Sequence, residues 1–322
     1  MSNSNINDKK IFTAVICGPT ASGKTALGVR IAQKLGGEIV SADSMQIYKG
    51  MDIASAKPTE EEMGGIPHHM MNFLPANKAF SVADYVEQAR SCIDDIHGRG
   101  KLPIIVGGTG LYISSLINNI KFDDTGSDSA FREKAGRIAR EKGNEALWTE
   151  LNNVDPVTAS RLHPNNLNRI IRALEVYHIS GSTISKAKQE SRREESPYKA
   201  CFIMPDFSRD ILYSRINKRV DIMLEQGLLE EAKEFFSHKD YVTAAQAIGY
   251  KELKPYFDGE KSLEECVEKL KQATRNYAKR QLTWFNKIED LNRIPSDNGI
   301  NDEEINKICF SLDNELVIFK DI

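Results

Sequence analysis

The hydrophobic positions in the first third of the chain alternate between short continuous runs and a helical spacing. Residues 11–17 (IFTAVIC), 38–42 (EIVSA) and 102–106 (LPIIV) are short apolar runs, typical of strands that are buried on both faces. Between the first two runs, residues 26–34 carry apolar side chains at helical spacing. This alternation predicts an α/β fold, a parallel sheet with helices on both faces.

The pattern changes near residue 121. Residues 122–128 (FDDTGSD) are polar and rich in turn formers, and the chain from there to residue 196 is charged and helical in pattern. A strand-like run returns only at 198–204 (YKACFIM). We therefore expect residues 121–196 to form a helical insertion into the α/β core.

The core should then comprise residues 1–120 and 197–295, with helices at its C-terminal end. The remaining tail, residues 296–322, is acidic at first and β-like at 315–319 (ELVIF). The sequence assigns no function to this tail.

Composition and charge are those of an ordinary globular protein. The 322 residues are 40% hydrophobic and 28% charged, which is enough for a large core. The polar start (MSNSNINDKK) has no apolar segment of the signal-peptide kind, and no run is long enough to span a membrane, so we expect a cytoplasmic protein. The net charge of −3 is not typical of a nucleic-acid binder, so an RNA partner would need a local basic surface.

The five cysteines are scattered and include no C-x-x-C pair. This spacing indicates neither a zinc site nor a disulfide framework. We expect the cysteines to be reduced and mostly in the core: Cys17, Cys92, Cys201, Cys266 and Cys309.

A glycine-rich motif, GPTASGKT, separates the first strand-like run from the first helical segment. It matches G-x-x-x-x-G-K-[ST], the phosphate-binding loop, in the expected strand–turn–helix context. Its backbone N–H groups can surround oxyanions, its lysine adds a positive charge, and its threonine hydroxyl can hold Mg²⁺. The alternative is a glycine turn without a ligand. The motif residues are Gly18, Pro19, Thr20, Ala21, Ser22, Gly23, Lys24 and Thr25.

The other motifs of nucleotide switches are missing. A GTPase should carry N-K-x-D, but the nearest approach, NKIE at 286–289, ends in the wrong residue. A motor or Ras-like switch should have an apolar strand that ends in an Asp near Mg²⁺, whereas the run 102–106 leads into GGTG. Both observations favour a small transferase, in which the loop holds a diphosphate or triphosphate donor.

Asp43 follows the second strand-like run, at the edge of a parallel sheet where ligands bind. A carboxylate there can act as a general base or contact Mg²⁺, or it can simply cap the next segment. A second glycine turn, GGTGLY at 107–112, follows the third run. It can bring backbone N–H groups and Thr109 to the same crevice, although a turn of this kind is weak evidence alone.

Taken together, the motifs resemble the tRNA dimethylallyltransferases, in their bacterial form without a zinc-finger extension. The matching segments are GPTASGKT, DSMQIY (43–48), AKP (56–58), PHH (67–69), GGTGLY, HPNNLNRIIRALEV (163–176), RINKRVDIMLEQGLLEEA (215–232), QAIGYKE (246–252) and RQLTWF (280–285). Two departures, HPNN for the common HPND and DIASAKP without a glycine–threonine pair, touch no expected catalytic group. They concern substrate detail more than reaction type.

The resemblance implies a fold, a reaction and partners. The expected fold is a P-loop NTPase-like, kinase-like core with a helical insertion that clamps the anticodon stem-loop of tRNA. The expected reaction moves a dimethylallyl group from dimethylallyl diphosphate to N6 of the adenine 3′-adjacent to the anticodon. The acceptors are tRNAs that read codons beginning with U, and diphosphate is released. We expect a monomer that uses Mg²⁺.

The resemblance also assigns chemical roles. Asp43 would accept the proton from N6, and Lys24, the loop amides and Thr25 with Mg²⁺ would neutralise the leaving diphosphate. Arg215 and Arg219, one turn apart on a predicted helix, would add positive charge at the donor. The alternative for this pair is a solvated basic face.

Further residues resemble tRNA-contacting positions of the family. They are Asp43, Ser44, Met45, Gln46, Thr109, Arg132, Asn168, Arg169, Ile170, Ile171 and Arg172. On the predicted helix around 168–172, apolar residues from Leu167 to Tyr177 should form a buried stripe and turn Asn168, Arg169 and Arg172 outward. For the arginines, ordinary helix-surface charge is the alternative.

A long helical segment at 262–287 opens with a capping box, Ser262 and Glu265, and has more basic than acidic residues. The same charge order suits the helix dipole, so it is weak evidence for RNA binding. Trp284 and Phe285 can stack on a base or belong to the core. The adjacent PHH histidines do not have the spacing of helical metal ligands and should instead hold a strand or loop in place.

Three other functions share some of these features. A small-molecule kinase would hold ATP in the loop and use Asp43 on a hydroxyl, but it needs no helical insertion. A prenyltransferase acting on AMP would keep the donor site and would not need an RNA clamp either. A non-enzymatic nucleotide-binding module would leave Asp43 and the paired arginines without a role.

Overall fold

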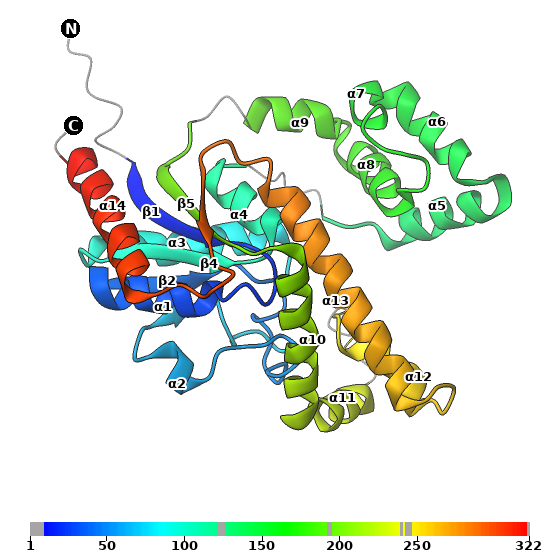
Figure 1. The fold of residues 1–322 in the computed structure, drawn as a ribbon. Coiled ribbons are helices and arrows are strands. Elements are labelled where there is room, and N and C mark those ends of the chain that lie inside the picture. The colour runs from blue at the N-terminus through cyan, green and yellow to red at the C-terminus, as the bar shows by residue number, and fades with distance from the viewer. Residues whose placement is uncertain (1–9, 121–125, 192–194, 239–240, 242–246, 321–322) are drawn as a thin grey trace, which may run out of the picture. The chain divides into compact units, whose positions relative to one another are not determined.

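The computed structural model describes residues 10–120, 126–191, 195–238, 241 and 247–320 (Figure 1). The chain divides into two compact units. The first comprises Met1–Ile117 and Pro197–Ile322, and the second Asn118–Ser196. The boundary of the second unit falls three residues before the predicted start of the insertion, 118 against 121.

The first unit is built on a six-stranded parallel sheet with the order β3-β2-β4-β1-β5-β6. The strands are β1 (Ile11–Cys17), β2 (Gly37–Ser41), β3 (His68–His69), β4 (Leu102–Gly107), β5 (Tyr198–Asp206) and β6 (Leu291–Pro295). The four predicted strands are confirmed, with ends that shift by up to two residues. The edge strands β3 and β6 were not predicted.

Helices cover both faces of this sheet, which confirms the predicted α/β layers (Figure 1). On one face, α3 (Val82–Gly98) and α4 (Gly110–Ile117) bury their apolar sides in a core with β1, β2 and β4. On the other face lie α1 (Lys24–Leu35) and α14 (Asp302–Lys320). Gly28 lets α1 approach β4 closely, because a Cβ there would lie 2.7 Å from Val106 Cγ2.

The predicted β-like tail is wrong. Residues 315–319 belong to α14, which buries Ile305, Ile308 and Leu312 at helical spacing against the sheet and α1. Its start is fixed by reciprocal bonds in which Asn301 N donates to Glu304 Oε2 at 2.8 Å and Glu304 N donates to Asn301 Oδ1 at 2.9 Å. A five-residue apolar run alone cannot distinguish a strand from part of a helix.

More helices of the first unit form a third core with residues 47–51. They are α10 (Arg209–Glu225), α11 (Leu228–Ser237), α12 (Tyr250–Phe257) and α13 (Leu263–Phe285), and the short α2 (Glu60–Met63) lies elsewhere, next to α1. The capping box predicted for the long helix is confirmed, since Ser262 and Glu265 cap α13 reciprocally. Gln246 of the QAIGYKE motif lies outside the described residues.

The described part of the second unit is helical, as predicted for the insertion. Its helices are α5 (Ser129–Lys142), α6 (Asn144–Val154), α7 (Pro156–Ala159), α8 (Leu167–Ser180) and α9 (Ile184–Ser191). They enclose a separate core that includes Leu147, Leu151, Ile170 and Leu174. The unit therefore has the apolar interior of a small domain.

A buried carboxylate joins β2, β3 and the start of β4. Glu38 is 2% exposed and accepts hydrogen bonds from Arg99, Lys101 and His69 Nε2. The bonds from Arg99 lower the pKa of Glu38 well below its usual range. His69 therefore holds an edge strand in place, as predicted for the PHH motif.

All five cysteines are free, and only Cys92 is not fully buried, which confirms the prediction. Among the helices that the structure describes, none combines the length and the apolar character that a membrane span needs.

Candidate active site

The phosphate-binding loop connects β1 to α1 and leaves the start of that helix open. Gly23 precedes α1 with φ +78°, and no side chain caps the first amides of the helix. These amides and the positive end of the helix dipole favour an anion. Within the loop, Ser22 Oγ is buried and has no hydrogen-bond partner among the described residues, so a ligand oxygen would satisfy it.

One amide of the loop is not available. Thr20 N donates to Gln281 Oε1 at 2.9 Å, so this N–H group is already bonded within the protein, and contact of the motif residues with the donor stays a prediction. Gly18 and Pro19 are buried at the end of β1 and give the loop its shape.

Lys24 and Thr25 line one small cavity together with Asp43, Gln46 and His68. The Lys24 ammonium donates to Pro19 O at 3.3 Å. Burial lowers the pKa of Lys24 to about 8, Asp43 opposes the shift and Arg219 adds to it. The structure therefore brings together the loop lysine, the loop threonine and the carboxylate, as predicted.

Asp43 caps the turn that follows β2. Its Oδ1 accepts from Met45 N at 2.9 Å and from Gln46 N at 3.4 Å. The capping alternative is thus correct as a structural role. It does not exclude a catalytic one, because both bonds end on Oδ1 and a proton can be accepted at Oδ2.

Ser44, Met45 and Gln46 follow Asp43 but have different surroundings. Ser44 N donates to Thr109 Oγ1 at 3.0 Å, and Met45 is partly buried against the third core. The Gln46 side chain accepts from Ser41 Oγ at 3.2 Å and donates to Ala56 O at 3.2 Å. Gln46 therefore joins the end of β2 to the AKP segment.

The second glycine turn serves the close packing of two strand ends more than the binding of an anion. A Cβ at Gly107 would lie 2.2 Å from Ala42 O, so only glycine lets the ends of β4 and β2 meet here. Thr109 N donates to Ala42 O at 3.0 Å and is not available to a ligand. The prediction of ligand-binding amides is wrong for Thr109, while its hydroxyl does reach the Asp43 side of the crevice.

The two arginines on α10 both turn toward the phosphate-binding loop and its surroundings. Arg215 Nε donates to Ala21 O at 2.9 Å, and its guanidinium lies 4.7 Å from the centroid of the Phe207 ring. Arg219 Nη2 donates to Ala56 O at 3.4 Å. Burial lowers the pKa of Arg219, and the charge of Asp43 opposes this shift. The alternative of a solvated basic face is therefore wrong for Arg219, whereas Arg215 is exposed and bonds the loop from the surface.

His68 is a site residue that the motif reading did not assign. Its Nδ1 lies 2.8 Å from Ile66 O, and its ring lines the cavity of Lys24 and Asp43. Its Nε2 is buried and has no hydrogen-bond partner among the described residues, and burial lowers the pKa of the ring. A polar ligand group would satisfy this nitrogen.

The protein oxygens near Lys24 suit Mg²⁺ only if donor phosphate and water complete its coordination shell. Among the described residues, no group of three or more His, Cys, Asp or Glu side chains could hold a metal. Mg²⁺ commonly takes one or two protein oxygens and completes its shell with phosphate and water. Thr25 and Asp43, which line the same cavity, match that pattern.

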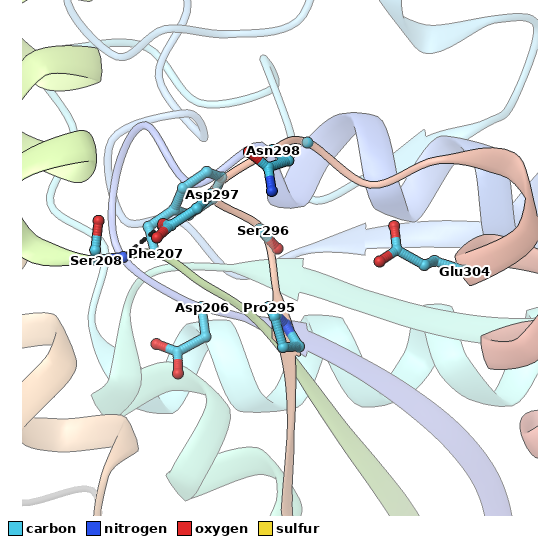
Figure 2. Close-up of a pocket in the computed structure, with 9 residues that line it drawn as sticks. Asp206, Phe207, Ser208, Pro295, Ser296, Asp297, Asn298 and Glu304 are labelled. Atoms are coloured by element: carbon cyan, nitrogen blue, oxygen red, sulfur yellow. Dashed lines mark hydrogen bonds between the residues drawn. The ribbon is translucent and has the colours of Figure 1, made fainter.

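A second hollow, about 430 Å³ in volume, lies at the ends of β5 and β6 (Figure 2). Asp206, Asp297 and Glu304 line it, and Asp297 Oδ1 accepts from Ser208 N at 2.7 Å. Three carboxylates repel a phosphate group. By charge, the loop around Lys24 is therefore the better place for the donor diphosphate.

In the second unit, Glu175 organises two of the predicted tRNA-binding arginines. Arg132 donates to both of its oxygens, at 2.8 and 2.9 Å, and Arg172 Nη1 donates to Oε2 at 2.6 Å. Although burial raises the pKa of Glu175, these bonds lower it to about 2. Arg132 and Arg172 thus have an internal partner and are not free surface charges.

The other residues of α8 that were predicted to bind tRNA differ in their exposure to solvent. Asn168 and Arg169 are exposed, as predicted. Ile170 and Ile171 are 0% and 9% exposed and belong to the core of the unit, so the prediction that they contact tRNA is wrong for their side chains. Tyr177 is 40% exposed and does not continue the buried stripe.

Residues of α13 also reach the site. Gln281 bonds the phosphate-binding loop, and Tyr277 is hydrogen-bonded to Thr109. The RQLTWF motif was a sequence signal for Gln281, whereas Tyr277 lies outside every motif. Phe285 is fully buried, whereas Trp284 is 40% exposed, so the two aromatics of that motif have different roles.

The sequence model of one protein family, described as IPP transferase, matches residues 46–288. A tRNA dimethylallyltransferase of Acetivibrio thermocellus is 50% identical over 91% of this chain and 94% of its own length. One of Geobacillus thermodenitrificans is 52% identical over 84% of this chain and 86% of its own.

Solved structures give the same result. The full-length tRNA isopentenylpyrophosphate transferase of Bacillus halodurans is 40% identical, with a TM-score of 0.74 over 97% of this chain and 99% of its own. A eukaryotic dimethylallyltransferase, solved acting on tRNA, is 32% identical, with a TM-score of 0.77 over 90% of this chain and 75% of its own. The chain belongs to the IPP transferase family, the tRNA dimethylallyltransferases.

Proposed function

We infer that the cavity shared by the phosphate-binding loop and Asp43 is the place where the chain modifies tRNA. The enzyme transfers the dimethylallyl group of dimethylallyl diphosphate to N6 of the adenine 3′-adjacent to the anticodon, in tRNAs that read codons beginning with U. The products are N6-(dimethylallyl)adenosine and diphosphate. The observation that carries this inference is that Lys24, Thr25 and Asp43 line one cavity.

The reaction needs catalytic assistance both at the nucleophile, N6, and at the leaving diphosphate. A new N6–C bond forms as the allylic C–O bond to diphosphate breaks, and N6 must lose a proton. We assign proton acceptance to Asp43, whose capping bonds leave one carboxylate oxygen for this role. The proton moves from N6 to Asp43 as the nucleophile attacks.

The leaving diphosphate gathers negative charge as the C–O bond breaks. Lys24, Arg219 and the open amides of α1 lie where they can stabilise it. Arg215 holds the loop itself through Ala21 O. Mg²⁺ bound to the Thr25 hydroxyl and to donor oxygens would neutralise further charge.

The acceptor adenine cannot react while it is stacked in the anticodon loop, so it must be turned out of the stack. We propose that Asp43 to Gln46 and Thr109 surround the extruded base. Asn168, Arg169, Arg132 and Arg172 of the second unit would contact the RNA backbone and neighbouring bases. We also propose that the enzyme works as a monomer in the cytoplasm, where its tRNA substrate is made in bacteria.

The test is a transfer assay with purified protein, Mg²⁺ and labelled dimethylallyl diphosphate. Undermodified tRNA, AMP and ATP are supplied in separate reactions. We expect label in tRNA alone, at the adenine beside the anticodon. Label in AMP but not in tRNA would favour an adenylate prenyltransferase. Turnover of ATP without prenyl transfer would favour a kinase.

A further inference from the structure

Gln281 of α13 joins the two glycine turns of the site. Its side chain is buried, with 5% of the residue exposed. Oε1 accepts from Thr20 N in the phosphate-binding loop at 2.9 Å, and Nε2 donates to Gly108 O in the second turn at 2.9 Å. The residue takes part in both bonds only as a neutral amide, because one end must accept and the other must donate.

The fit of α13 on the second turn is close. A Cβ at Gly108 would lie 2.2 Å from Gln281 Nε2, and a Cβ at Gly110 would lie 2.4 Å from Trp284 Cδ1. Tyr277, one turn before Gln281, is hydrogen-bonded to Thr109. Residues 277, 281 and 284 share one face of the helix. This face therefore contacts each of residues 108, 109 and 110.

The second turn in turn holds the acceptor side of the crevice. Thr109 N donates to Ala42 O at 3.0 Å, and Thr109 Oγ1 accepts from Ser44 N at 3.0 Å. These partners are the two neighbours of Asp43 in the chain. The Gln281 amide therefore connects the loop expected to hold the donor to the turn that holds the expected general base.

We propose that Gln281 is a positioning residue, which sets the distance and angle between donor and acceptor groups without touching either substrate. The proposal rests on the proposed function of the cavity. Displacement of reacting groups by about 1 Å can cost about 10²-fold in rate. The loss of either bond of Gln281 should therefore lower the rate of the chemical step and leave the strength of donor binding nearly unchanged.

The test compares Gln281→Leu, which loses both bonds, with Gln281→Glu, which keeps the acceptor for Thr20 but cannot donate to Gly108 O. Gln272→Glu is the matched control, because Gln272 is an exposed residue of the same helix. The single-turnover rate with tRNA, the Kd of dimethylallyl diphosphate by calorimetry and the Tm are measured for each protein. If Gln281→Leu does not fold, Gln281→Met replaces it, since methionine keeps the length of the side chain and also loses both bonds.

We expect the single-turnover rate to fall by about 10²-fold in the Gln281 variants and to be normal in the control, with a donor Kd within about threefold of wild type in the uncharged variant. In Gln281→Glu the added negative charge at the loop should also weaken donor binding. An unchanged rate in a folded variant would overturn the proposal. So would a donor Kd of the uncharged variant that weakens as much as the rate falls, because Gln281 would then only maintain the loop. The wild-type reaction with tRNA reports separately on the proposed function.

Discussion

At the scale of single residues, the site depends on Lys24, a lysine whose charged form is disfavoured by burial. Burial lowers the pKa of Lys24 to about 8, and Arg219 contributes to the shift. A lysine on the surface would remain charged to a pH of about 10. Two nearby cations without their anion cost free energy, which a bound diphosphate would recover as binding energy.

This predicts a pH dependence of donor binding. Below about pH 8 free Lys24 is protonated and attracts the diphosphate, whereas above its pKa the free enzyme must first take up a proton. The donor Kd should therefore rise above about pH 8, by up to about tenfold per pH unit. Calorimetric titrations between about pH 7 and pH 10 measure this.

The control for that experiment is Lys24→Arg, since arginine stays charged throughout this range. Its donor Kd should be weaker than that of wild type and independent of pH. A wild-type Kd that stays constant to about pH 10 would show that Lys24 keeps an ordinary pKa.

At the scale of elements, the chain after the matched family region still contributes to the core. The family model ends at residue 288, yet Ile305, Ile308 and Leu312 of α14 are buried against one face of the sheet and α1. Because α1 begins at the phosphate-binding loop, α14 supports the helix that carries Lys24 and Thr25.

Truncation of one buried residue tests this support. Leu312→Ala should lower the free energy of unfolding by about 2–4 kcal/mol, since Leu312 is 1% exposed. Phe310→Ala is the matched control on the same helix, where the side chain is 70% exposed, and it should change stability little. Urea unfolding of both variants measures the difference. Equal effects would mean that α14 does not pack as described.

The elements that could be predicted from sequence are those with a strong local pattern. The buried runs of β1, β2, β4 and β5 and the capping box of α13 are local signals. The strand β3 has only two residues, and β6 has the polar sequence LNRIP, so neither shows a strand pattern. Residues 315–319 looked like a strand because an apolar run of this length is the same in a strand and in part of a helix.

The same distinction applies to the candidate site. Lys24, Thr25 and Asp43 could be predicted because a known loop and the end of a parallel strand carry them. Gln281 could not, because its partners are backbone atoms 261 and 173 positions away. Ile170 and Ile171 were assigned to tRNA by resemblance alone, although their helical spacing already predicted burial.

At the scale of the whole molecule, the predicted tRNA contacts are divided between the two compact units. Asp43 to Gln46 and Thr109 belong to the first, and Arg132 and residues 168–172 belong to the second. With this division, we expect the first unit to bind the donor and the reacting adenine, and the second unit to contact only the tRNA. Substitutions in the second unit should then alter the use of tRNA alone.

Arg169 offers the clearest test, because its side chain is exposed. Arg169→Glu should raise the KM for tRNA by about tenfold, reduce the salt dependence of tRNA binding by about one phosphate contact, and leave the KM for dimethylallyl diphosphate unchanged. Steady-state kinetics over a range of salt concentrations measure this. Lys307→Glu on α14 makes the same charge change in the first unit and should have no effect on tRNA. A tRNA KM that is equal in both variants would contradict a role for Arg169.

The central claim is that Asp43 accepts the N6 proton during prenyl transfer to tRNA. The most direct test is the single-turnover rate of Asp43→Asn, since asparagine keeps an oxygen to cap Met45 N and Gln46 N but loses the basic carboxylate. We predict a rate lower by about 10²- to 10⁴-fold, with a donor Kd close to that of wild type. A rate near that of wild type, or a donor Kd that weakens as much as the rate falls, would contradict the assignment of Asp43 as the base.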